Sequence, residues 1–187
     1  MRKCRLSLFR LIDRVVVAGI ATAIIVFSST TLVPSRAHGT ETTTVSENGA
    51  TVLDYGIYSH SILGYTEAPN DISGQRFTAA DVRLIRQTQT ILAQLDLTFG
   101  FRYRITDPKL LGRRLTITVR FPKMTNPANG KSGTKLVDHF VVTGEERREL
   151  FRFDYTWEMA EGRWLFQVLD GSTVIVEIPF RVIVGVN

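Results

Sequence analysis

Three histidines, His38, His60 and His139, are the residues of this chain best suited to metal chemistry. His38 follows Ala37, and cleavage between them would offer a copper ion an amine and an imidazole from one residue. His60 or His139 could then supply a second imidazole. A metal centre also needs neighbouring groups that hold its ligands in place, and the Thr- and Glu-rich segment after His38 offers none. We therefore expect no cofactor, and the alternative is a secreted copper-binding or glycan-active protein that uses His38.

His139 also lies beside Asp138, and such a pair could bind a metal or act as a base. Neighbouring residues of a strand point to opposite faces, so the two side chains cannot share a site without a bulge. Lys131-Ser132-Gly133 is similar to an element of penicillin-binding enzymes, but the Ser-x-x-Lys motif that those enzymes also need is absent from the sequence. Gly-x-Ser-x-Gly and His-Glu-x-x-His are absent as well. The sequence therefore predicts no catalytic residues and a protein that is not an enzyme.

Four arginines, Arg102, Arg104, Arg114 and Arg120, occupy the polar positions of two successive alternating segments. If these two segments paired directly, the four side chains would form a basic stripe suited to a carboxylated glycan or a phosphate group. Acidic and basic residues are equally numerous after the first 37 residues. We therefore favour a solvated face with ion pairs between strands.

Two segments, Ser59–Phe77 and Pro122–Thr134, are predicted to be loops because they are rich in Gly, Pro and Asn. Long loops in a compact domain often carry function. The candidate ligand-binding residues on them are Tyr65, Lys123 and Asn126. We predict that any interaction surface includes at least one of the two loops.

The two tryptophans could each stack on a sugar ring. Trp164 opens an alternating segment two residues after Gly162, and this position predicts a core residue. Trp157 lies at the end of its predicted strand and is the less constrained ring. We therefore count only Trp157 among the candidate ligand-binding residues.

The elements that position these residues follow a distinct N-terminal segment. Residues 1–37 contain five basic residues near their start, an uncharged apolar run over Val15–Phe27, and Ser35-Arg36-Ala37. This order is typical of a secretory signal peptide. We expect a periplasmic or secreted protein that makes no membrane contact after cleavage. The alternative is an uncleaved anchor, because Val15–Val33 approaches the ~20 residues that span a bilayer.

Removal of residues 1–37 would change the charge of the protein. The chain has 23 basic and 18 acidic residues, of which this leader holds six and one, so 17 of each remain. A neutral domain lacks the excess positive charge that attracts nucleic acid, and we expect no such partner. The single cysteine, Cys4, also belongs to the leader, so we expect no disulfide.

Alternation of apolar and polar residues dominates the remaining sequence. Residues 38–51 are polar and predict a flexible lead-in, and residues 52–187 form the predicted domain. The period of two indicates strands with one buried face. It is clearest over Leu95–Ile105, Leu115–Phe121, Phe151–Tyr155, Trp164–Val168 and Val174–Val184, and weaker over Val52–Tyr58 and Leu136–Val142.

Three local signals complete the predicted fold. Asp170-Gly171 predicts a hairpin, and Pro179 indicates an edge position or a bulge in the last strand. Ala80–Ile91 fits either a strand or a short helix that begins at the capping box Thr78-Ala79-Ala80-Asp81. The sequence as a whole predicts an all-β fold, an antiparallel immunoglobulin-like β-sandwich of about seven to eight strands with no disulfide.

Several short motifs resemble one family of bacterial proteins. They are Asp54-Tyr55-Gly56, Phe99-Gly100-Phe101-Arg102-Tyr103, Pro122 before a Pro/Asn/Gly segment, and Gly162-Arg163-Trp164 followed by the Asp170-Gly171 hairpin. Over roughly residues 52–184 the chain is similar to domain of unknown function 3859. The resemblance implies an exported or envelope-associated β-sandwich and transfers no activity.

These inferences lead to one expected function. We expect a non-enzymatic binding or structural module of the bacterial envelope, with an envelope protein or a glycan as its partner. The oligomeric state is left open.

Overall fold

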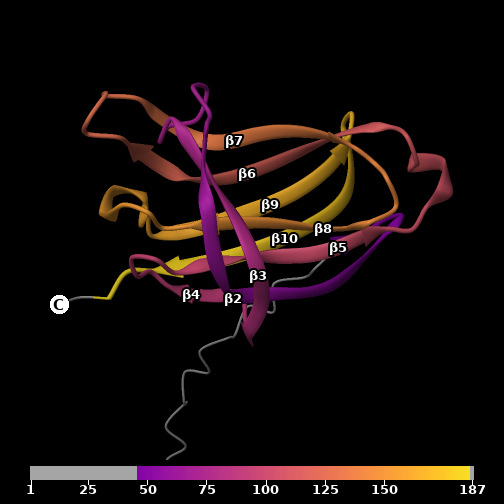
Figure 1. The fold of residues 1–187 in the computed structure, drawn as a ribbon, viewed down its shortest axis with the longest axis horizontal. Helices are drawn as coiled ribbons and strands as arrows, with labels where there is room; N and C mark the ends of the chain where they lie inside the picture. Colours follow the sequence, from indigo (N-terminus) through magenta and orange to yellow (C-terminus); the bar gives the residue numbers. More distant parts are fainter. Residues whose placement is uncertain (1–45, 186–187) are drawn as a thin grey trace, which may run out of the picture. The chain divides into compact units, whose positions relative to one another are not determined.

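A computed structural model describes residues 46–185 (Figure 1). The predicted signal peptide, His38 and residues 38–45 of the predicted lead-in lie outside the described residues. The strands are β1 (Ser46–Glu47), β2 (Ala50–Glu67), β3 (Gln75–Gln87), β4 (Thr90–Leu92), β5 (Thr98–Ile105), β6 (Arg114–Thr125), β7 (Ser132–Val141), β8 (Glu146–Arg152), β9 (Gly162–Asp170) and β10 (Thr173–Ile183), and two short 3₁₀ helices are η1 (Pro108–Leu110) and η2 (Thr156–Glu158). None of the helical segments within residues 46–185 has the length and apolarity that crossing a membrane requires.

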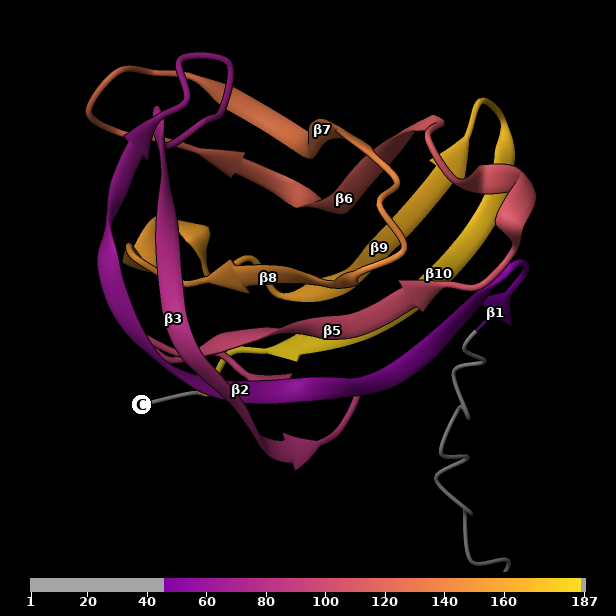
Figure 2. The same ribbon diagram turned by 45° about the vertical axis from the view of Figure 1, so that its right-hand side comes forward.

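The strands form two sheets, which face each other as layers in Figure 2. Sheet A has six strands in the order β1-β10-β9-β6-β7, with β4 added to β10, and sheet B has four in the order β3-β2-β5-β8. All pairs are antiparallel except β4 with β10. The predicted antiparallel sandwich is confirmed. There are more strands than the predicted seven to eight, because β1 and β4, of two and three residues, accompany the long ones.

An aromatic core fills the space between the sheets. Trp164 and Phe101 are fully buried, as their positions on alternating strands predict. The Trp164 ring lies 4.8 Å from Phe151 and 5.0 Å from Phe121, measured between ring centroids. Its Nε1–H donates a 2.9 Å hydrogen bond to the carbonyl of Ala160, so the one polar atom of the buried ring has a partner.

The last two strands form the predicted hairpin. β9 and β10 pair on either side of Gly171, which has a φ of +60° that glycine adopts readily. Pro179 lies where β10 has β9 on one side only, because β1 pairs with Val176 and Glu177 and β4 begins its pairing at Arg181. Its missing N–H therefore leaves no gap in a ladder, as the prediction of an edge position requires.

Several strand boundaries differ from those predicted. β8 is displaced at both ends, since it spans Glu146–Arg152 where Phe151–Tyr155 was predicted. β5 begins at Thr98 rather than Leu95, because Asp96 has a φ of +67° and turns the chain just before the strand. The ambiguous segment from Ala80 is the second half of β3, followed by β4, and not a helix. β2 begins at Ala50, within the predicted lead-in, because Ala50 already pairs with Ile105 of β5.

The two predicted loops are largely strand. β2 continues to Glu67 and β3 begins at Gln75, so only the turn between them is irregular in Ser59–Phe77. Bulges interrupt the β2–β3 register at several points, and they hide the period of two from the sequence. Likewise, β6 and β7 fill most of Pro122–Thr134 on either side of a turn.

The β2–β3 hairpin extends beyond the rest of sheet B, and its tip reaches β7 of sheet A, as Figures 1 and 2 both show. Two hydrogen bonds hold the tip to the β6–β7 turn. Asn126 Nδ2 donates to the carbonyl of Ile72 at 3.0 Å, and Lys131 Nζ donates to the carbonyl of Pro69 at 2.7 Å. The hairpin therefore links the two sheets on one side of the sandwich.

Candidate functional site

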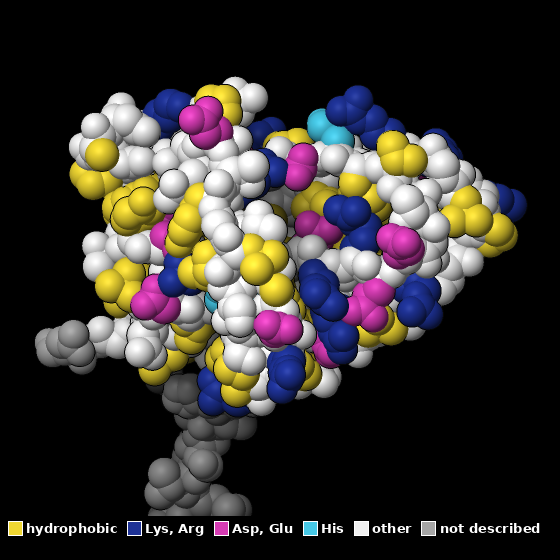
Figure 3. All heavy atoms as spheres, viewed as in Figure 1, with side chains coloured by type: hydrophobic (Ala, Val, Ile, Leu, Met, Phe, Trp, Pro, Cys, Tyr) yellow, Lys and Arg dark blue, Asp and Glu magenta, His cyan; other side chains and the backbone are white. Residues whose placement is uncertain are grey.

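A groove of about 380 Å³ lies between β3, β7 and β8. In Figure 3 this face is hollowed beside the β2–β3 hairpin, with hydrophobic side chains at depth and charged ones at the margin. The apolar residues that line the groove come from β3, β6, β7 and β8. They are Phe77, Ala79, Val82, Ile117, Val119, Leu136, Val137, Leu150 and Phe151.

The groove lies where both sheets end, each in an edge strand that has no partner from the other sheet. β7 is the last strand of sheet A and β8 the last of sheet B, and neither pairs with the other. The inward residues of these edge strands, Leu136 and Phe151, remain partly exposed. Their cross-strand partners one strand further in, Val119 and Phe99, are buried. The groove is therefore an accessible margin of the same apolar layer that forms the core.

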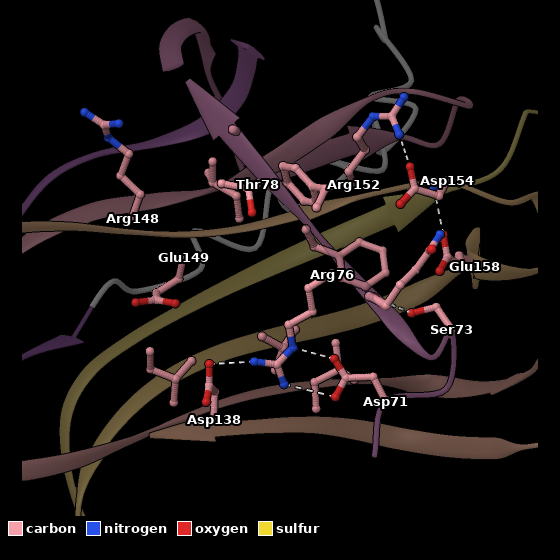
Figure 4. Close-up of a pocket in the computed structure, with 18 of the residues that line it drawn as sticks. Asp71, Ser73, Arg76, Thr78, Asp138, Arg148, Glu149, Arg152, Asp154 and Glu158 are labelled. Carbon is pink, nitrogen blue, oxygen red and sulfur yellow. Dashed lines mark hydrogen bonds and ion pairs between the residues drawn. The ribbon is translucent and has the colours of Figure 1, made fainter. Parts of the chain in front are cut away.

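Arg76 joins the hairpin to β7 across one end of the groove (Figure 4). Its guanidinium contacts both oxygens of Asp71, at 2.5 and 3.0 Å, and reaches Asp138 on β7 at 2.5 Å. A further hydrogen bond of 3.4 Å goes to the carbonyl of Val137. The side-chain hydrogen bond to Asp71 raises the pKa of Arg76 above its usual range. Because its donors already have partners, Arg76 is a clasp between two strands and is poorly placed to bind a ligand.

A second arginine is held in the same way at the η2 end of the groove. Arg152 pairs with Asp154 and Asp96, and its Nη1 donates to the hydroxyl of Tyr65 at 3.1 Å. The Arg152 side chain is only 11% exposed. Tyr65, a predicted ligand-binding residue, therefore contacts the Arg152 network instead of standing free on a loop.

Glu149 is an acidic residue that lines the groove. Its Oε1 accepts a 3.1 Å hydrogen bond from the hydroxyl of Tyr103 and lies 3.5 Å from Nε of Arg147. Burial raises the pKa of Glu149 to about 7. Beside it, Arg147 stacks over Phe140 of β7, with 3.9 Å between its guanidinium carbon and the ring centroid, and so bridges the two edge strands.

Glu158 is a buried acid that organises the η2 turn. Its carboxylate accepts the backbone N–H groups of Asp154 and Tyr155 at 2.7 and 3.0 Å. Burial raises the pKa of Glu158 to about 7, although these N–H groups stabilise the anion. The turn presents Trp157, which stacks on Tyr155 with 5.5 Å between ring centroids. Trp157 is half-buried and does not line the groove.

The β8 strand brings backbone groups to the groove as well as side chains. It pairs with β5 on one side and has no strand on its other side in the described part of the chain. The carbonyl oxygen of Glu149 points at β5, because it lies directly against Gly100 on that strand and would contact any side chain placed there. Backbone groups alternate in direction along an antiparallel strand, so those of Leu150 point away from β5.

The two histidines within the described residues lie on different elements. His139 faces outward from β7, with Nδ1 at 3.1 Å from Oγ1 of Thr116, while Asp138 points to Arg76, as the opposite faces of a strand predict. His60 packs on Phe77, and burial lowers its pKa. Residues 46–185 contain no group of three or more His, Cys, Asp or Glu side chains that could hold a metal ion.

The alternative of a basic stripe, which required direct pairing of the two segments, does not form, because the segments belong to different sheets. Arg102 and Arg104 belong to β5 in sheet B, whereas Arg114 and Arg120 belong to β6 in sheet A. Arg102 binds Asp54 with Nε at 2.9 Å from each carboxylate oxygen, and its Nη1 donates to Glu146 at 3.1 Å. That arginine is therefore part of a cross-strand ion-pair network.

The other predicted ligand-binding residues, Asn126 and Lys123, lie outside the groove. Asn126 is buried in the β6–β7 turn, and its side chain serves the turn and the hairpin tip. Lys123 is exposed on β6 and does not line the groove. Sequence reasoning missed Arg76, Glu149 and Leu150. The available signal was the adjacent apolar pair Leu150-Phe151 in an otherwise charged strand, which is typical of an edge strand with both faces partly covered.

Comparison with known proteins identifies a family and a fold. The family described as "Domain of unknown function (DUF3859)" matches residues 46–182. A solved structure of an immunoglobulin-like protein from Pseudomonas aeruginosa is similar, with a TM-score of 0.52 and 22% sequence identity, and the match covers 76% of this chain and 98% of that one. No curated protein matches the chain. At this identity the solved structure shows the fold alone, and it supports the predicted immunoglobulin-like class.

Proposed function

The chain belongs to the DUF3859 family, and we propose that it is an exported, non-enzymatic binding module whose groove holds an extended segment of another polypeptide. The observation that carries this proposal is the combination of an apolar groove with the unpaired edge of β8. An extended peptide can add to such an edge by main-chain hydrogen bonds, and its alternate side chains can enter an adjacent apolar pocket.

The groove supplies both parts of that recognition. Leu150 directs its N–H and C=O away from β5, where an incoming strand could pair with them. Phe77, Val82 and Leu136 offer apolar surface within the same groove. One strand added to β8 would cover this surface and give the edge a partner.

The charges of the groove favour binding over catalysis. Arg76 and Arg152 are each held by two carboxylates, so they are committed to the fold. Within the described residues Oε2 of Glu149 accepts no hydrogen bond, and a Lys or Arg of the incoming segment could pair with it. We therefore expect the bound segment to be extended and apolar on one side, with a basic residue near Glu149.

The place of action follows from the leader. The basic, apolar and Ser-x-Ala order of residues 1–37 supports export, and intact-mass analysis of the exported protein should find a chain that begins at His38. A species in the membrane fraction that retains residues 1–37 would instead indicate an anchor. The expected partner is thus a protein of the bacterial envelope.

Selection of binders from a library of random short peptides, followed by titration of the best peptide, tests the proposal. Leu150→Pro removes the outward N–H and leaves the bonds of its neighbours to β5 in place, and Ala79→Trp fills the groove. We expect each change to weaken peptide binding at least tenfold. Leu63→Trp, at a residue 69% exposed outside the groove, is the matched control and should leave affinity unchanged.

Amide hydrogen exchange provides a second readout in the same experiment. The amide of Leu150 should become protected when the peptide binds. If binding is equal in Leu150→Pro and wild type, or if Leu150 stays unprotected, peptides do not add to β8 and the proposal fails.

A further inference from the structure

The outward face of sheet A carries a row of four basic side chains, Arg120, Lys135, Arg163 and Arg181, of which only Arg120 was a candidate from the sequence. Lys135 on β7 pairs with Arg120 on β6, and Arg163 on β9 pairs with Arg181 on β10. Arg120 pairs with Leu165, two residues from Arg163, so the two pairs are diagonal neighbours. The row therefore crosses four adjacent strands, which are spaced about 4.8 Å apart.

These four side chains are free to bind. All four are exposed, and the residues beside Arg120 and Arg181 in the chain are buried, which fixes the outward direction of the row. Within the part of the chain that the structure describes, none of the four makes an ion pair. By contrast, Arg102 on the other sheet is bound to Asp54 and Glu146.

We propose that this basic row binds a linear carboxylated polysaccharide. The cations would contact successive carboxylates of the polymer. Leu165, which is partly exposed, pairs with Arg120 and lies two residues from Arg163, would meet the apolar face of a sugar ring. This inference is independent of the peptide groove, which lies among β3, β7 and β8 and includes none of the four basic residues.

The surroundings of the row favour a linear partner over a planar one. The next row of the same face contains Thr118, Gln167 and Glu177, and Gln167 Nε2 donates to the Glu177 carboxylate at 2.7 Å. A flat anionic membrane lying on the face would meet this carboxylate. A polymer that follows the basic row avoids it.

Titration of the full chain with polygalacturonate tests the proposal. We expect saturable binding that weakens as salt is added, and little binding to the methyl-esterified polymer, which lacks the charge. Arg120→Gln and Arg163→Gln should each weaken binding about threefold, and the double variant about tenfold if the two side chains contact separate carboxylates independently. Neither change should alter peptide binding in the groove, so the two proposals can fail separately.

The matched control removes the same charge elsewhere. Arg83→Gln with Arg86→Gln changes two exposed arginines on β3, outside the row and outside the groove. This control should bind polygalacturonate as wild type does. Equal weakening in the control and the row variant, equal binding of the esterified polymer, or binding to vesicles of phosphatidylglycerol or to single-stranded DNA in preference to the polymer would each overturn the proposal.

Discussion

The core and the groove contain the same kind of apolar side chain on neighbouring strands, yet only the core is closed to solvent. Phe99 of β5 is fully buried, whereas its cross-strand partner Phe151 on β8 is partly exposed. The difference is one of position in the sheet, because β5 has a strand on each side and β8 has one on a single side. Burial in a sandwich therefore depends on the sheet order as well as on the alternation of the sequence.

The same comparison explains where the charges lie. The aromatic neighbours of Trp164 include the uncharged rings of Phe121, Phe151 and Phe153. Around the groove, Arg76, Arg152 and Glu149 stand beside apolar residues. Water that reaches an open margin can solvate a charge, while a closed interior makes an unpaired charge very costly. The margin can therefore hold polar groups for recognition that the core cannot.

The largest effect should come from the core. Trp164→Ala and Phe101→Ala should each lower the free energy of unfolding by roughly 3–5 kcal/mol, since a large cavity replaces a ring with no exposed surface. Denaturant unfolding provides the measurement. A change below ~1 kcal/mol for either variant would mean that the inward face has been misassigned.

Breaking the clasp should have an intermediate effect. Arg76→Gln leaves the buried carboxylate of Asp71 without its cation, and we expect a loss of about 1–2 kcal/mol. Hydrogen exchange should rise in the β2–β3 hairpin and stay unchanged in β9 and β10. Asp138→Asn is the control, because that side chain is 58% exposed and its loss should cost much less. Uniform exchange across the domain would show that the hairpin does not open as a unit.

A smaller and pH-dependent effect is expected at Glu149. Its pKa is raised from 4.5 to about 7, so between these values the folded protein holds a proton that the unfolded chain has released. Folding is therefore favoured below pH 4.5, and the contribution of this group to stability falls as the pH rises towards 7. Glu149→Gln should match wild type at pH 4 and be more stable than wild type at pH 8, where the folded wild-type protein holds a buried carboxylate charge. Chemical denaturation at both pH values measures this, and a variant that is less stable than wild type at pH 8 would contradict it.

The smallest effect is expected at the exposed basic row. Arg120→Gln should change the free energy of unfolding by less than about 0.5 kcal/mol, because its side chain is exposed and has no ion pair in the described residues. The same denaturant measurement applies. A larger loss would show that Arg120 supports the sheet and would remove the reason for assigning it to a ligand.

Sequence alone could predict the strands whose alternation is unbroken. β5, β6, β9 and β10 each bury one face, and the period of two identifies most of their residues. The β2–β3 hairpin could not be recognised, because bulges interrupt its register and Gly64 and Ser61 resemble loop residues. Each bulge adds one residue to a strand and shifts the alternation of inward and outward side chains, so the sequence no longer shows a period of two.

The candidate site was less predictable because it depends on pairing between distant segments. A stripe of Arg102 with Arg120, the less favoured alternative, could not form because the successive strands β5 and β6 belong to different sheets. The basic row of Arg120 with Arg163 depends on a pairing between β6 and β9 that no local pattern encodes. The burial of Glu149 beside Tyr103 depends on another strand, and the sequence around Glu149 does not indicate this contact.

The contacts of the hairpin also have a consequence for the order of events during folding. The two arms of the β2–β3 hairpin are close in sequence and can pair early, whereas its tip is held by residues 54 and 62 positions away. Contacts over such separations form late, because a long loop must first be closed. Until the tip docks, the apolar residues beside β8 are accessible to other unfolded chains. The interval between hairpin formation and docking is therefore the time when we expect this protein to be most prone to aggregation.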